Sequence, residues 1–218
     1  MHRNQIPMNW LVALACITIG VFLGTGTDCS AGITRPEEPQ GGRQIAYDHL
    51  VHMFQSDPRF FGDFLPGDLS LVEPLQEYTV TKEKFALGNL LPGATFSNWS
   101  YVIMHGDKVL GHVDVKANGE TGKMQWDGTS HTPTYDGSLV NAMHIAEQLP
   151  QVKERDYEAR ILGVPFGFLY VLWLHGKTDD ILIPLLPVPH GVKAGQPYTE
   201  SEIIKFLNEA AEARSKPQ

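Results

Sequence analysis

The stretch "YVIMHGDKVLGHVDV", from Tyr101 to Val115, is the most informative part of the sequence for the architecture. It places a Gly-Asp pair between two apolar runs, which predicts a β-hairpin with a two-residue turn. Gly106 at the first central position favours a type II′ turn, whose twist matches that of the strands. A similar phrase, "YVLWLHGKTDDILIPL", follows from Tyr170 to Leu185 and predicts another hairpin. Antiparallel β-structure should therefore form the core of this protein.

A regular ladder built outward from the first turn assigns the side chains of this hairpin to two faces. It pairs His105 with Lys108, and side chains then alternate along each strand. One face is apolar and should lie on the core; it carries Val102, Met104, Val109, Val113 and Val115. The other face is mixed, and from it we take the candidate ligand-binding residues Trp99, Tyr101, His112 and Asp114. The alternative is an ordinary solvent-facing sheet surface with cross-strand pairs.

The second hairpin has a four-residue "GKTD" loop, which pairs His175 with Asp180 and Trp173 with Leu182. A His-Asp pair at the end of a hairpin fits either a surface ion pair or a ligand contact. Pro184 lacks an N–H group, so the strand from Ile181 onward should lie at a sheet edge or end there.

The composition limits the classes of partner. The 218 residues include 17 Lys and Arg against 25 Asp and Glu, which gives a formal net charge of −8. A nucleic-acid-binding protein needs clustered basic residues to neutralise phosphates, and no such cluster is present. We therefore expect an unidentified protein, peptide or small ligand as the partner, and no nucleic acid.

The N-terminus has the pattern of a secretory signal. Arg3 precedes an apolar run over residues 11–24, and small residues follow up to Ala31. The run is shorter than the ~20 residues of a spanning helix, which favours export with cleavage after Ala31. Membrane attachment is expected only if this segment stays uncleaved. Both cysteines, Cys16 and Cys29, would be removed with it.

The rest of the chain predicts one α+β domain. Residues 32–43 have the composition of a flexible tether, residues 44–214 form the domain, and residues 215–218 are a tail. Helical patterns near residues 45–54, 138–148 and 199–214 alternate with groups of strands, which predicts helices on one face of a mainly antiparallel sheet. Two α-β-β-β units, 44–130 and 131–214, are one interpretation. The order of elements is similar to that of cystatin-like exported domains in outline.

Zinc binding is the sharpest alternative to simple ligand binding. His49 and His52 are three residues apart on the first predicted helix, and both imidazoles could reach one ion. A third ligand would come from His144, His131 or Asp136. The pattern differs from His-Glu-x-x-His, in which a helix supplies two ligands and a base.

Three functional hypotheses follow. The first is an exported, non-catalytic module without a cofactor that binds its ligand through the mixed sheet face. The second is an exported zinc-dependent, hydrolase-like enzyme. The third is a structural envelope protein anchored by an uncleaved N-terminus. The sequence has no Gly-x-Ser-x-Gly elbow and no phosphate-binding glycine loop, which disfavours common hydrolases. Ser130, His131 and Asp136 lie close in sequence, but proximity along the chain is no evidence for a triad.

Overall fold

A computed structural model describes residues 32–57, 59–60, 64–72 and 74–215. The helices are α1 (Gly42–Ser56), α2 (Lys82–Ala86), α3 (Pro133–Gln148), α4 (Pro150–Glu154) and α5 (Glu200–Ser215). The strands are β1 (Ile33–Thr34), β2 (Ser70–Leu71), β3 (Leu75–Thr79), β4 (Thr95–His105), β5 (Lys108–Ala117), β6 (Met124–Ser130), β7 (Tyr157–Val164), β8 (Leu169–Gly176) and β9 (Asp180–Pro184). Two short 3-10 turns lie at Pro66–Asp68 and Pro165–Gly167.

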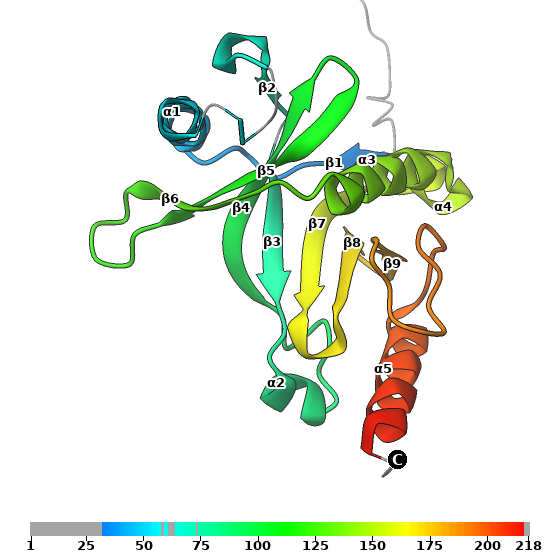
Figure 1. Cartoon of the computed structure of the whole chain (residues 1–218). Helices are drawn as coiled ribbons and strands as arrows, with labels where there is room; N and C mark the ends of the chain where they lie inside the picture. Colours follow the sequence, from blue (N-terminus) through cyan, green and yellow to red (C-terminus); the bar gives the residue numbers. More distant parts are fainter. Residues whose placement is uncertain (1–31, 58, 61–63, 73, 216–218) are drawn as a thin grey trace, which may run out of the picture.

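All of these strands belong to one mixed, mainly antiparallel sheet, as the sequence predicted (Figure 1). Its main order is β6-β5-β4-β3-β7-β8-β9, while β1 pairs with β7 and β2 with β4. Two antiparallel meanders, β4 to β6 and β7 to β9, are joined through β3, which pairs in parallel with β7. The α+β class is therefore confirmed.

The helices cover both faces of the sheet, whereas the sequence suggested one. Helix α3 packs on one face through Leu139, Ala142 and Ala146. The other face carries α1 at the β4–β6 end and α5 at the β7–β9 end. The central strands carry apolar side chains on both faces, so their sequence patterns do not show which helix covers which face of the sheet.

The register of the first hairpin differs from the expected one. Gly106 has a φ of +54°, and His105 pairs with Lys108 as predicted. Beyond the turn, however, Met104 pairs with Val109 while Ile103 pairs with Gly111, so the intervening residue of β5 is an extra one. This β-bulge at Leu110 shifts every later pair by one residue. Because side chains alternate, the residues of β5 beyond the bulge lie on the opposite face of the sheet, relative to β4, from the one expected.

After the bulge, Val102 pairs with His112 and Tyr101 pairs with Val113. Val113 and Val115, expected beside Val102, instead lie with Tyr101 under α1. His112 and Asp114 consequently lie on the α3 face of the sheet.

The second hairpin has the predicted register. His175 pairs with Asp180, Trp173 with Leu182, and Val171 with Pro184. Strand β9 is the last strand of the main order, which accommodates the missing N–H of Pro184. The capping pattern at the start of α5 also forms, because Thr199 N–H donates to the Glu202 carboxylate at 2.8 Å.

The segment predicted as a tether, residues 32–43, makes ordered contacts. Ile33 and Thr34 pair with β7, and the Arg43 guanidinium donates to the Glu38 carboxylate. The predicted secretory signal, residues 1–31, lies outside the described residues, as do most residues of the predicted tail. Within the described ranges, no helix combines the length and the apolar character needed to cross a bilayer.

Candidate functional site

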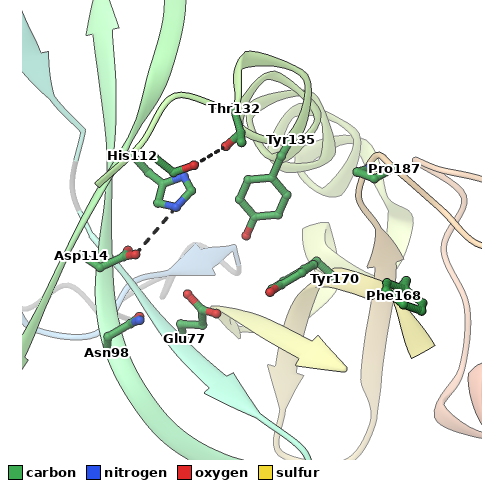
Figure 2. Close-up of a pocket in the computed structure, with 10 residues that line it drawn as sticks. Glu77, Asn98, His112, Asp114, Thr132, Tyr135, Phe168, Tyr170 and Pro187 are labelled. Carbon is green, nitrogen blue, oxygen red and sulfur yellow. Dashed lines mark hydrogen bonds and ion pairs between the residues drawn. The ribbon is translucent and has the colours of Figure 1, made fainter. Parts of the chain in front are cut away.

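A cavity of about 410 Å³ lies between the start of α3 and the sheet (Figure 2). This volume is within the range of small-molecule sites, about 300–1,000 Å³. Its polar walls come from β3, β4, β5 and the end of β6, while α3 and β8 each add a tyrosine. The lining residues are Glu77, Asn98, His112, Asp114, Ser130, Thr132, Tyr135, Phe168, Tyr170 and Pro187. Among them there is no Lys or Arg.

His112 is oriented by a carboxylate behind it. Its Nδ1 lies 2.7 Å from Oδ1 of Asp136, which is fully buried in the first turn of α3. The Thr132 hydroxyl donates to Oδ2 of the same carboxylate at 3.0 Å. Because this carboxylate accepts both bonds, Nδ1 carries a hydrogen and Nε2 is directed away from Asp136. Nε2 lies 3.7 Å from Asp114, beyond hydrogen-bond distance.

The surroundings of His112 favour its charged form. Burial alone lowers the pKa of His112, but the hydrogen bond with Asp136 and the charges of Asp114, Asp136 and Glu77 outweigh burial, and the pKa is raised. An imidazolium held between two carboxylates is the result.

We expect Asp136→Asn to lower the pKa of His112 by roughly one pH unit or more, because one full negative charge is removed at hydrogen-bond distance. The measurement is an NMR titration of the His112 ring protons. Asp180→Asn is the matched control, since Asp180 pairs with His175 at a similar distance of 2.8 Å on another strand pair. An unchanged His112 titration in Asp136→Asn would contradict this account of the raised pKa.

Two acceptor atoms in the cavity wall lack a partner. Oδ1 of Asp114 and Oδ1 of Asn98 are buried and accept no hydrogen bond in the part of the chain that the structure describes. Burial also raises the pKa of Asp114, although His112 and a hydrogen bond from Ser100 act in the opposite direction. A buried unsatisfied acceptor costs about 1–3 kcal/mol, and such atoms call for an explanation.

Glu77 is the third carboxyl group near the cavity. Burial raises the pKa of Glu77 to about 7, and the charge of Asp114 adds to the effect, while His112 and Asn98 oppose it. Its side chain lies on the α3 face of the sheet because side chains alternate along β3 and Leu75, two residues earlier, packs in the α3 cluster; Asn98 is its cross-strand neighbour. A carboxyl group of this kind exchanges its proton near neutral pH, which is common in functional sites.

Two tyrosines complete the wall. The rings of Tyr135 and Tyr170 meet edge to face with centroids 5.3 Å apart, and Tyr135 also contacts the His112 ring. Figure 2 shows both hydroxyl groups pointing toward the carboxyl group of Glu77. Burial, together with the charge of Glu77, raises the pKa of both tyrosines, so both hydroxyls stay neutral.

The four predicted ligand-binding residues are divided between the two faces. His112 and Asp114 line the cavity. Tyr101 is fully buried beneath α1, and Trp99 packs at the edge of the same cluster. The groove that was expected to combine all four residues therefore does not form, because the bulge at Leu110 turns the two pairs to opposite sides.

The structure does not bring the predicted zinc ligands together. His49 lies on α1 and stacks on Trp126 with ring centroids 3.9 Å apart. His52 is on the same helix, but His144 is on α3, across the sheet, where it lies 3.6 Å from Glu147. In the described ranges, no group of three or more His, Cys, Asp or Glu side chains is arranged to hold a metal ion.

Sequence patterns did not identify Glu77, Tyr135 or Tyr170 as site residues, and they indicated Asp136 only as a metal or triad candidate. Helix α3 begins earlier than expected, with Pro133 in its first turn. Proline favours the first helical turn, so Pro133 could have extended the predicted helix to include Tyr135 and Asp136. Glu77 and Tyr170 are 93 residues apart along the chain, and no local pattern connects them.

We compared the chain with protein-family models, curated proteins and solved structures, and none of the three comparisons found a match.

Proposed function

We propose that this chain is an exported, non-catalytic module that takes a small ligand into the cavity between α3 and the sheet. One observation carries this proposal: Oδ1 of Asp114 and Oδ1 of Asn98 are buried in the cavity wall without a hydrogen-bond partner among the described residues. A ligand that donates hydrogen bonds to these atoms would remove the cost of leaving them unsatisfied. The export component rests on the N-terminal sequence pattern alone.

The arrangement of polar and apolar groups also supports a binding role. Small-molecule sites are mostly apolar pockets with a few polar groups that fix the orientation of the ligand. Here the exposed residues Phe168 and Pro187 supply an apolar rim, and most of the polar side chains are more buried. The oriented His112 and the hydrogen-bonded Asp136 keep the wall in one arrangement before the ligand arrives.

The test is a screen of a mixed fragment library by ligand-observed NMR against the folded protein. We expect several fragments to bind the wild type and to lose at least about tenfold in affinity in Ser130→Phe, which fills the cavity. The matched control is Ser201→Phe at an exposed position of α5, which should leave binding unchanged. If no fragment depends on the cavity, or if both variants behave alike, the binding proposal is wrong.

Acid–base catalysis is a second candidate function, favoured by the orientation of His112. A histidine with its Nδ1 bonded to a buried carboxylate and its Nε2 free of hydrogen bonds has the geometry of a general acid or base. Mass spectrometry of each bound fragment after incubation separates the two candidates. Unaltered fragments support binding, whereas products that disappear in His112→Gln support catalysis.

A further inference from the structure

We propose that the ligand of this cavity is an organic cation, a primary amine attached to an apolar group. This inference rests on the proposed binding function and names the class of ligand. It is carried by three independent features of the cavity: the balance of charge, the excess of hydrogen-bond acceptors, and the aromatic rings beside them.

The charge balance is negative. Glu77, Asp114 and the buried Asp136 supply three carboxyl groups, and His112 is the one basic side chain among the described residues that line the cavity. The imidazole is already engaged, because Asp136 binds its Nδ1 and Asp114 lies 3.7 Å from its Nε2. Among the described residues that line the cavity, Glu77 therefore has no cationic side chain of its own. A buried carboxylate without a counter-ion is costly, and a bound cation would compensate it.

The hydrogen-bonding groups require a donor. Within the described part of the chain, Oδ1 of Asp114 and Oδ1 of Asn98 lack partners, and Glu77 adds further acceptor capacity when it is ionised. An ammonium group has three donors and no acceptor, which complements a cavity wall that carries these three acceptor groups. A carboxylate or phosphate ligand has only acceptors and would face these oxygens with like polarity, so anionic ligands are disfavoured.

The aromatic rings lie where the ammonium group would be placed. A Cβ atom built on Gly163 of β7 would lie 3.0 Å from the Tyr170 ring and 3.7 Å from a carboxyl oxygen of Glu77, so these two groups lie side by side. The Tyr135 ring also meets the Tyr170 ring, with centroids 5.3 Å apart. A cation within about 6 Å of a ring centroid is attracted to the ring face.

The entrance favours an apolar body on the amine. Phe168, at the turn between β7 and β8, and Pro187 line the outer part of the cavity. An amine with an aromatic or aliphatic group could keep its charge beside Glu77 while its apolar part contacts these two residues. This arrangement distinguishes an apolar amine from a free metal cation or a small inorganic ion.

Three probes of similar size test the inference: 2-phenylethylamine, 2-phenylethanol and 3-phenylpropionate. Isothermal titration at pH 8 should give an affinity for the amine at least about tenfold higher than for the alcohol, and weakest binding for the carboxylate. Glu77→Gln and Asp114→Asn should each weaken amine binding about tenfold and weaken alcohol binding by a smaller factor, because the alcohol carries no charge. The charge-matched control is Glu147→Gln, at an exposed site on α3.

The pH dependence provides a second readout on the same complex. The groups that act on Glu77 are Asp114, His112, Asn98 and Asp127, with Tyr135 and Tyr170 beside it. A cation favours ionised Glu77, whose pKa is about 7. The affinity for 2-phenylethylamine should therefore rise about tenfold between pH 6 and pH 8. Glu77→Gln should remove most of the rise.

The outcomes separate this inference from the binding proposal. If the alcohol or the carboxylate binds in the cavity as tightly as the amine, the ligand class is wrong but the binding function stands. If none of the three probes binds while other fragments depend on the cavity, the ligand class is again wrong and the binding function again stands. If no fragment depends on the cavity, both proposals fail. An amine affinity that falls from pH 6 to pH 8 also overturns the assignment of a cation.

Discussion

Tyr101→Ala is expected to lower the free energy of unfolding by about 3–5 kcal/mol, the range for large aromatic truncations in a core. The Tyr101 side chain is fully buried and packs with Ala46, Leu50 and Phe54 of α1. Its hydroxyl also donates to Glu38 at 3.2 Å. Truncation would therefore open a cavity under α1 and release the segment that leads into this helix. Urea unfolding followed by circular dichroism measures the effect.

Two controls separate packing from other effects of Tyr101. Tyr101→Phe keeps the ring and removes the hydrogen bond, so we expect a loss of only about 1 kcal/mol. Trp126→Ala removes an aromatic side chain that is 44% exposed and should have a much smaller effect than Tyr101→Ala. If Tyr101→Ala unfolds at the same urea concentration as the wild type and loses ligand binding instead, the core assignment of this face is wrong.

Glu77→Gln is expected to stabilise the protein at pH 8 by about 3 kcal/mol. The pKa of Glu77 is raised from 4.5 to about 7 in the folded state, mainly by burial. The folded protein therefore retains a proton that the unfolded chain releases, so wild-type stability falls as the pH rises from about 4.5 to 7 and the loss is complete above 7. Gln at this position carries no charge and avoids the loss.

The difference in stability between Glu77→Gln and the wild type should grow as the pH rises. At pH 4, both states of the wild type hold the proton, and the difference between wild type and Glu77→Gln should be small. Glu209→Gln, at an exposed position of α5, serves as the surface control and should change stability little at either pH. Equal stability of wild type and Glu77→Gln at pH 8 would show that Glu77 ionises in the folded protein at its ordinary pKa.

Local signals were sufficient for the presence of α1, α3 and α5 and for the register of one hairpin. The "GKTD" loop fixes the register of β8 and β9 because the ladder that follows it is regular. Thr199 and Glu202 identify the start of α5, since capping depends on residues three positions apart. The division of helices between the two faces depends instead on packing between distant segments, and no local pattern specifies it.

The candidate site was only half predictable. His112 and Asp114 were chosen from the mixed composition of one strand, but their partners come from β3, α3 and β8. The bulge that separates them from Tyr101 leaves one trace in the sequence, Gly111. A Cβ atom at this position would lie 2.1 Å from the Ser130 carbonyl oxygen, so only glycine fits there. Glycine inside a strand pattern is a known indicator of a bulge, and it could have corrected the register.

The bulge at Leu110 also has a consequence for sequence comparison. Because one extra residue sets which face the rest of β5 presents, a strand without it would direct residues of the same types to the opposite layer. An alignment of this chain with a strand that lacks the bulge must therefore place a gap at Leu110. Without the gap, positions that line the cavity would be matched with positions under α1. In this strand, length carries as much functional information as residue identity.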